Sequence, residues 1–386
     1  MEKPDNEIDK QFDLPIDLNE EDFEEEELGE SEEEAVEPFD PKKVDVSIQT
    51  PNLGTLIARL EHDEINLMPD FQRSGDLWSK QIQSRLIESI LIRLPIPAFY
   101  FDASYDESWQ VVDGLQRLSA INNFVVKKTL NLTKLEFLTE YEGFSYDKLP
   151  RTLKRRIDEF QTSVYLIKPG TPIMMKYSLF NRINTGGLKL NPQEIRHAMS
   201  QSINKGFAST FLSELVNTQE FKSVVVNKNH RMAHEELALR HITFSMFGEN
   251  SYKSSLPKFL NQGMVSLGSE DREIAYELKE RFLASLDTAY KIFGKHSFKK
   301  SLALPEHKKV VNKPMFEAIS VCLAELDDDQ LRQLVIHKDM VVENFTELLQ
   351  SKEFDLSISK STANTDNVQT RFGQSRDAIN KVLRNI

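Results

Sequence analysis

The charge of this chain is distributed so unevenly that only the part after residue 40 can form a hydrophobic core. The first 40 of the 386 residues carry 19 acidic and 2 basic side chains, including the run Glu24-Glu25-Glu26-Glu27. Such a segment has too little apolar surface to offset the entropy of ordering it, and its charges repel one another. We therefore expect a disordered acidic tail over residues 1–41. It serves either to solubilise the protein or as a polyanion that occupies a basic cleft and competes with nucleic acid.

The rest of the chain has the composition of a folded and mildly basic body. It carries 46 basic and 42 acidic side chains, so the net charge of −13 belongs to the tail. No apolar run approaches the roughly 18–20 residues that span a bilayer, and the acidic amino terminus does not have the pattern of a signal peptide. The single cysteine, Cys322, excludes an intramolecular disulfide and a multi-cysteine zinc site. We expect a cytoplasmic protein without membrane contact.

Hydrophobic periodicity divides this body into a mixed region and a helical region. Short apolar strands are predicted at 65–67, 98–101, 110–112 and 163–167. They lie between amphipathic helices, of which the first is predicted at 53–60 and the last at 192–200. After about residue 206 the helical spacing dominates. The sequence predicts an α+β domain over residues 42–205, followed by a mainly α-helical domain over residues 206–386.

The segment from Trp109 to Ala120 holds the strongest candidate for a functional site. A buried strand ends at Asp113, turns at Gly114 and enters a helix whose first turn carries Gln116 and Arg117. A helix N-terminus suits an anion, and a glycine lets the backbone approach it. Arg117 could add a charge-assisted contact, and Asp113 could hold a divalent metal or take a proton from water. The alternative is a capped helix in which Asp113 and Arg117 pair with each other.

Two further segments carry polar groups that suit phosphate or ribose. Gln72 and Arg73 lie in a loop between a predicted strand and a predicted helix. The second segment places Asn181, Arg182, Asn184 and Thr185 at a helix end before two glycines. Ordinary C-capping explains that second pattern equally well.

Taken together and in order, these segments resemble a known family. The succession Pro-x-Phe-Gln-Arg, Asp-Gly-x-Gln-Arg and Phe-x-Arg-x-Asn-x-Gly-Gly is similar to the N-terminal domain family of GmrSD-type modification-dependent restriction enzymes, the DGQQR family. The resemblance covers roughly residues 45–200 and implies a fold similar to ParB and sulfiredoxin. The family's first Gln is Leu115 here, which removes one polar group from the turn.

The resemblance implies nucleotide chemistry in defence against phage. Relatives bind and hydrolyse nucleoside triphosphates, and many couple this reaction to DNA cleavage. Carried over by position, the implied active turn is Asp113, Gln116 and Arg117, with Asp113 as the residue that would hold Mg²⁺. The implied nucleotide- and phosphate-binding residues are Gln72, Arg73, Gly114, Asn181, Arg182, Asn184 and Thr185.

We therefore expect a Mg²⁺-dependent nucleoside-triphosphate hydrolase that acts as a sensor or regulator in antiviral defence. The expected partners are a nucleotide, DNA and a separately encoded effector protein, and the chain could form a homo-oligomer. One alternative is a DNA nuclease that uses the Asp113 turn directly on a phosphodiester. The other is a non-catalytic module that binds DNA or protein. Short basic patches such as Lys154-Arg155-Arg156 and Phe298-Lys299-Lys300 suit DNA phosphates, although exposed helix faces give the same pattern.

Overall fold

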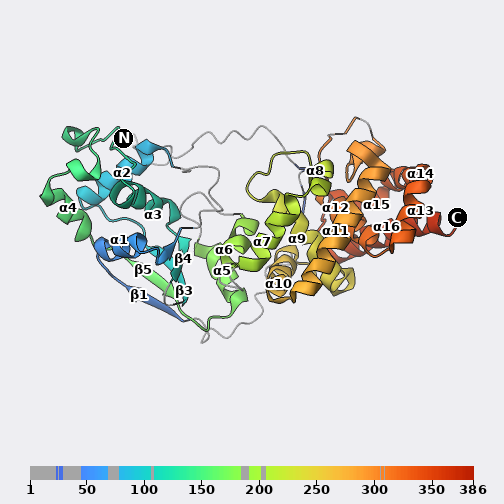
Figure 1. The fold of residues 1–386 in the computed structure, drawn as a ribbon, viewed down its shortest axis with the longest axis horizontal. Coiled ribbons are helices and arrows are strands. Elements are labelled where there is room, and N and C mark those ends of the chain that lie inside the picture. The colour runs from blue at the N-terminus through green and yellow to red at the C-terminus, as the bar shows by residue number, and fades with distance from the viewer. Residues whose placement is uncertain are drawn as a thin grey trace, which may run out of the picture. The chain divides into compact units, whose positions relative to one another are not determined.

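The computed structural model describes residues 23–24, 26–28, 45–67, 78–105, 108–183, 191–200, 206–304, 306–307 and 309–386 (Figure 1). The chain forms two compact units. The first, here called the sheet unit, comprises residues 34–211 and 260–270. The second, here called the helical unit, comprises residues 1–33, 212–259 and 271–386. The predicted α+β fold, a sheet region followed by helices, is confirmed. Among the described helices none is long and apolar enough to cross a membrane.

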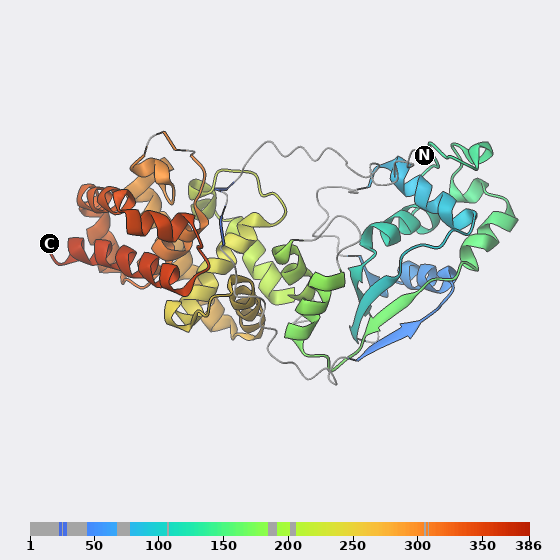
Figure 2. The same cartoon turned by 180° about the vertical axis from the view of Figure 1, so that it is seen from behind.

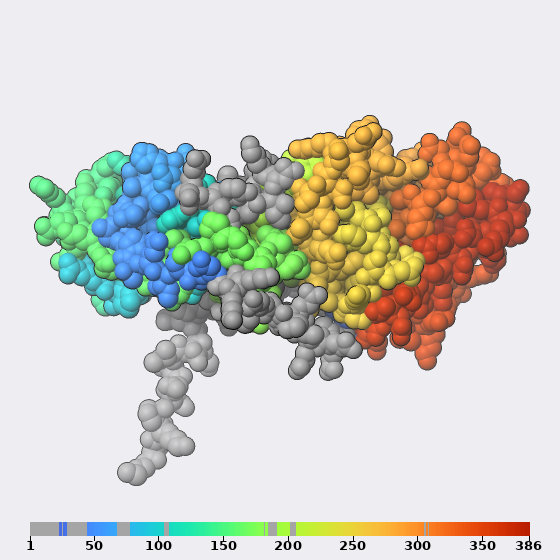
Figure 3. All heavy atoms as spheres, turned by 90° about the horizontal axis from the view of Figure 1, so that it is seen from below, coloured from blue at the N-terminus to red at the C-terminus, as the bar shows by residue number. Residues whose placement is uncertain are grey.

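A five-stranded mixed sheet forms the centre of the sheet unit. Its strands are β1 (Val46–Gln49), β2 (Ile65–Asn66), β3 (Phe99–Tyr105), β4 (Ser108–Asp113) and β5 (Val164–Ile167), in the order β1-β5-β3-β4-β2. β4 runs parallel to β2 and antiparallel to β3, while β5 runs parallel to β3 and antiparallel to β1. β1 is thus an edge strand, and the space-filling view of Figure 3 shows the blue part of this unit, β1 with α1 (Leu53–Glu61), at the surface.

Side chains that alternate along the strands give the sheet two buried faces. Phe99, Phe101 and Val111 belong to the larger core, which also contains Ile87 of α2 (Lys80–Leu91) and Leu118 of α3 (Leu115–Ile121). Helices α1 and α4 (Arg151–Asp158) complete this layer, and α3 continues into a π-helical turn at Asn122–Val126. Figures 1 and 2 show these helices on one side of the sheet and α5 with α6 on the other.

The second face packs on helices α5 (Ile173–Ile183) and α6 (Pro192–Ser200). Val112 of β4 lies here in a small apolar cluster with Tyr177 and Phe180 of α5. α6 begins with a reciprocal cap, in which Glu194 accepts the N–H of Asn191 and the Asn191 side chain accepts the N–H of Glu194. Two helical layers therefore enclose β4 and exclude water from it.

The helical unit is built around one buried helix. This helix, α12 (Lys313–Ala324), packs against α9 (Ala233–Phe247), α11 (Arg272–Phe293) and α16 (Thr365–Leu383). This unit also contains α8 (Gln219–Val224), α13 (Asp328–Ile336), α14 (Lys338–Gln350) and α15 (Lys352–Ser359), while the residues of α7 (Phe207–Val216) and α10 (Leu256–Ser269) are divided between the two units. Short 3₁₀ turns lie at Thr139–Tyr141, Tyr146–Lys148, Glu249–Ser251, Gly294–His296 and Lys300–Leu302.

A buried ionic network links the helices of this unit. Glu317 of α12, which is fully buried, pairs with Arg371 of α16 and at 3.2 Å with Arg240 of α9. Cys322 of α12 is also buried, and burial raises the pKa of its thiol. The thiol therefore behaves as part of the apolar core.

Part of the acidic tail has a defined position on the helical unit, which differs from the expectation of disorder over all of residues 1–41. Residues 23–24 and 26–28, here called the docked segment, form bridges from Phe23 to Val311 and from Glu27 to Lys360. The charge pattern alone predicted repulsion within the tail. The structure adds the cations of the body, which compensate that repulsion at Glu24 and Glu26.

Candidate functional site

The turn at the end of β4 follows directly from its sequence. β4 is buried up to Val112 and ends at Asp113, which is partly exposed. Gly114 then takes a left-handed conformation with φ +97°, and a Cβ atom at this position would lie 2.5 Å from the Phe99 ring. Only glycine satisfies both conditions without strain. α3 starts at the next residue and has no side-chain cap at its N-terminus.

Arg117 turns its guanidinium back onto this turn. Its Nη2 donates to Asp113 Oδ2 at 2.8 Å, and its Nη1 donates to the carbonyl oxygens of Ala98, at 3.2 Å, and Pro97. The guanidinium also lies 5.0 Å from the centre of the Phe99 ring. Arg117 is 9% exposed, and burial lowers its pKa from the ordinary value while Asp113 opposes that effect. The structure thus shows the paired arrangement of Asp113 and Arg117.

This pairing assigns different roles to the two charged residues. Arg117 donates hydrogen bonds to three oxygen atoms of the protein, one of them on Asp113, and so orients the Asp113 carboxylate. The Asp113 side chain keeps 22% of its surface exposed, and the hydrogen bond from Arg117 goes to its Oδ2 atom. Gln116 is half-buried beside it, whereas Leu115 packs against the large apolar core. The groups of the turn that can meet a ligand are therefore Asp113, Gln116 and the uncapped N–H groups at the start of α3.

Two tyrosines that the sequence interpretation did not select lie next to the turn. Tyr100 pairs with Asp113 across β3 and β4 and with Tyr165 across β3 and β5. The two tyrosine rings stack with a centroid distance of 4.6 Å. Burial raises the pKa of Tyr100, and Tyr165 and Asp113 add to this rise. Both residues occupy ordinary strand positions, so their proximity follows only from the order of the strands.

A second buried ion pair supports the opposite face of the sheet. Lys176 of α5 lies 2.7 Å and 2.9 Å from the two carboxylate oxygens of Asp102 on β3. Both side chains are at most 5% exposed. A pair at this depth is costly to break because one charge would remain uncompensated. It holds α5 against β3 at this point.

The other predicted ligand residues fall partly outside the described structure. Gln72, Arg73, Asn184 and Thr185 lie outside the described residues, and Asn181 is described only as a backbone position of α5. Arg182 is exposed in the last turn of α5. The structure therefore brings Asp113, Gly114, Gln116 and Arg117 together, and the positions of the remaining predicted residues stay predictions.

β2 and α5 both run toward the end of the sheet at which the Asp113 turn lies. β2 and β4 are parallel, so β2 ends, at Asn66, on the same side of the sheet as the carboxyl end of β4 at Asp113. α5 passes from Lys176, which contacts Asp102, to Phe180, which packs with Val112 of β4. Asp102 pairs with Gln110, which precedes Val112 and Asp113 in β4. α5 therefore runs in the same direction as β4, toward the Asp113 turn.

The side chains at the turn could coordinate Mg²⁺ only together with ligands from outside the protein. Among the described residues no group of three or more His, Cys, Asp or Glu side chains is placed to share a metal ion. Asp113 supplies one carboxylate, and Arg117 already binds one of its oxygens. Mg²⁺ is commonly held by one or two carboxylates together with substrate phosphates and water. Asp113 would therefore hold Mg²⁺ only together with ligands from substrate and water, and the described residues form no dedicated cage for it.

A known protein family matches part of the sheet unit. Residues 54–200 match the family model described as GmrSD restriction endonuclease, N-terminal domain. Over these residues the chain is similar to a GmrSD-type N-terminal domain. The matched range contains the strands β2 to β5 and the whole Asp113 turn, and it lies within the sheet unit. No curated protein and no solved structure matches the chain. The expected likeness of this domain to ParB and sulfiredoxin therefore stays a prediction.

Proposed function

We propose that the GmrSD-type domain binds a nucleoside triphosphate at the Asp113 turn and hydrolyses it, as part of a restriction system that defends against phage. The description of the matched family as a restriction endonuclease domain supports the biological role. The observation that carries the chemical proposal is the partly exposed carboxylate of Asp113, which Arg117 holds at 2.8 Å beside an uncapped helix start.

The turn supplies two complementary groups for phosphoryl transfer. The N–H groups at the start of α3 offer hydrogen bonds to phosphate oxygens, and Gly114 allows the phosphate to approach the backbone. Asp113, oriented by Arg117, would accept the proton of an attacking water, and Gln116 would orient that water. A Mg²⁺ ion bound with the triphosphate would be held by Asp113 and would neutralise phosphate charge.

The geometry changes the role that the resemblance gave to Arg117. A guanidinium that already binds Asp113 and two carbonyl oxygens is a positioning group. It acts through Asp113 and does not provide the main contact to phosphate. Asp113 lies close enough to Tyr100 to help raise the pKa of that tyrosine, and the stacked Tyr100 and Tyr165 offer an aromatic surface near the turn. A nucleobase could stack on such a surface.

A direct nuclease is the second candidate, because the matched family description names a restriction endonuclease. In that case the same Asp113 carboxylate would activate water for attack on a phosphodiester. A non-catalytic module that binds DNA or protein is the third candidate. An effector encoded separately would then carry out the cleavage, with this chain as its sensor or regulator.

Three assays on the full chain separate these candidates. Release of inorganic phosphate from nucleoside triphosphates with Mg²⁺ would support the proposal, and a Gln116→Ala variant should lower the rate because the attacking water loses its orientation. Nicking of a plasmid without triphosphate would support the nuclease instead. Retention of DNA on the protein in the absence of both activities would support the binding module.

A further inference from the structure

The docked segment contacts the helical unit through its backbone at both ends. Besides its two bridges, Glu24 N–H donates to the carbonyl oxygen of Val311 at 3.2 Å. At the other end, the N–H of Thr362 donates to the carbonyl oxygen of Glu27 at 3.0 Å. These backbone contacts depend little on side-chain identity, so they fix the path of the segment and leave its specificity to the side chains.

Two carboxylates of the docked segment occupy separate cationic positions. Glu26 accepts hydrogen bonds from both Nη atoms of Arg240, at 3.0 Å and 2.6 Å, and from the hydroxyl of Thr362, at 2.9 Å. Glu24 lies 2.9 Å from Lys300 Nζ and accepts a hydrogen bond from Asn312 Nδ2 at 2.8 Å. A two-pronged guanidinium contact and a lysine–amide pair are also the contacts by which proteins hold phosphate.

The cationic positions belong to the folded body. Arg240 is 2% exposed and Lys300 is 6% exposed, so their charges need anionic partners. Glu236, Glu317 and Asp355 compensate them in part. Burial raises the pKa of Glu26, but the charges of Arg240 and Lys313 outweigh that effect and its pKa lies below the ordinary value. The folded body therefore selects an anion at this position.

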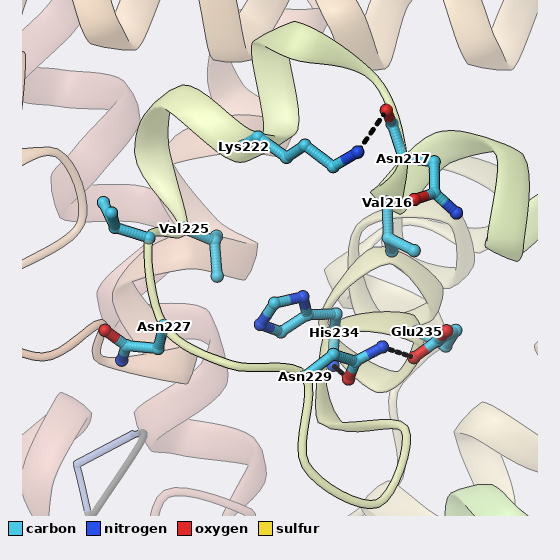
Figure 4. Close-up of a pocket in the computed structure, with 9 residues that line it drawn as sticks. Val216, Asn217, Lys222, Val225, Asn227, Asn229, His234 and Glu235 are labelled. Carbon is cyan, nitrogen blue, oxygen red and sulfur yellow. Dashed lines mark hydrogen bonds between the residues drawn. The ribbon is translucent and has the colours of Figure 1, made fainter. Parts of the chain in front are cut away.

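An aromatic position precedes the two anionic positions. The ring of Phe23 meets the ring of His234 edge to face at a centroid distance of 6.0 Å, and Lys313 Nζ lies 5.5 Å from the Phe23 ring centre. His234 also lines a cavity of about 320 Å³ together with Asn217, Lys222 and Asn229. Figure 4 shows the His234 ring pointing into this cavity, with Lys222 and Asn217 on its opposite side.

The docked segment thus presents a flat ring followed by two negative charges in an extended chain. A nucleic-acid strand offers similar groups, because its bases stack on aromatic side chains and its successive phosphates bind cationic side chains. We infer that the groove formed by Arg240, Lys300, Asn312, Lys313, Thr362 and His234, here called the Arg240 groove, binds single-stranded nucleic acid, and that the docked segment is an internal mimic which competes for it. The site is separate from the Asp113 turn and does not depend on its chemistry.

Binding of a fluorescently labelled oligothymidylate of about 16 nucleotides to the full chain tests this inference. The variant E24Q/E26Q removes both carboxylates of the mimic. The matched control E32Q/E33Q removes the same charge elsewhere in the tail. We expect E24Q/E26Q to tighten binding about tenfold, and its affinity to fall more steeply with salt by a slope of about 1.4, because two further phosphate contacts become available. The control should change the affinity much less.

A further variant assigns the gain to the groove. Lys313 is partly exposed, so Lys313→Gln in the E24Q/E26Q background should preserve folding and reverse most of the gain in affinity. Equal tightening in E32Q/E33Q would show general repulsion by the tail and overturn the inference. So would an unchanged affinity of E24Q/E26Q, or a loss of helical circular dichroism in that variant, which would make the segment a structural strap. Displacement of the oligonucleotide by inorganic triphosphate at equal phosphate concentration would assign the groove to free polyphosphates.

Discussion

At the residue scale, one arginine determines how the Asp113 turn is understood. The sequence alone left open whether Arg117 faces a ligand or pairs with Asp113. The structure shows the pair, and it adds two backbone carbonyls that the sequence did not indicate as partners. These carbonyls belong to Pro97 and Ala98, about twenty residues earlier in the chain, so only the folded sheet brings them to the guanidinium.

The Arg117 contacts predict a structural cost for its removal. Arg117→Ala should lower the free energy of unfolding of the sheet unit by about 2–4 kcal/mol, because it leaves Asp113 and two carbonyls without their donor. Arg182→Ala, at an exposed position of α5, is the control and should change stability by less than about 0.5 kcal/mol. Urea unfolding measures both. An unchanged midpoint for Arg117→Ala would show that the guanidinium faces a ligand instead.

Gly114 and Gly143 provide a matched test of the turn. Both have positive φ angles, +97° and +78°, but a Cβ atom at Gly114 would meet the Phe99 ring at 2.5 Å, whereas nothing lies within 4 Å at Gly143. Gly114→Ala should cost about 3 kcal/mol from backbone strain and overpacking, and Gly143→Ala about 1 kcal/mol from strain alone. Thermal unfolding of the two variants checks the difference. Equal losses would mean that Phe99 moves aside without cost.

At the element scale, local patterns predicted much of the sheet unit. The sequence predicted helices over 53–60 and 192–200, and the structure has α1 at Leu53–Glu61 and α6 at Pro192–Ser200. Serine is a favoured N-cap residue, and the Ser79 side chain accepts the N–H of Ile82 at the start of α2. The order of the strands was not predictable from these patterns, because it depends on pairings such as Tyr100 with Tyr165 that join distant segments.

The contact between α9 and α12 predicts a pH dependence of stability. His241 of α9 is 1% exposed, its Nδ1 lies 2.7 Å from the Ser320 hydroxyl, and burial lowers its pKa from 6.5 to about 3. Between these values the unfolded chain binds a proton that the folded chain excludes, so stability falls as the pH drops below 6.5. This residue should account for a loss of about 2 kcal/mol between pH 7 and pH 5.

Urea unfolding of the wild type and of His241→Gln at both pH values checks this contribution. The variant has no ionisable group at the position, so its stability should fall less between pH 7 and pH 5. The same decrease in both proteins would show that other groups cause the acid sensitivity.

At the scale of the whole molecule, the division into two units predicts separate unfolding signals. Both tryptophans of the chain, Trp78 and Trp109, lie in the sheet unit. Glu317→Gln disrupts the buried network in the helical unit and should cost about 3–5 kcal/mol. The transition seen by circular dichroism should shift, and the transition seen by tryptophan fluorescence should not. Glu347→Gln, which affects an exposed pair with Lys381, is the control.

Identical shifts of both signals in Glu317→Gln would show that the chain unfolds as one cooperative unit.

The whole-molecule scale is also where the sequence interpretation was least complete. Charge counting predicted an acidic tail but not its docking, because the cations that receive Glu24 and Glu26 come from residues more than 200 positions later. One of the two roles considered for the tail, a polyanion in a basic cleft, agrees with this docking.

The central claim, that Asp113 is the reactive group of a triphosphate-hydrolysing turn, is tested most directly by phosphate release from Asp113→Asn. Asparagine keeps an oxygen for Arg117 but cannot take a proton from water. With Mg²⁺ and triphosphate the variant should lose about 100-fold or more of the wild-type rate. Its tryptophan-detected melting should stay near that of the wild type. Asp147→Asn, at an exposed carboxylate, should keep the full rate. A wild-type rate in Asp113→Asn, or no phosphate release by the wild type itself, would contradict the account.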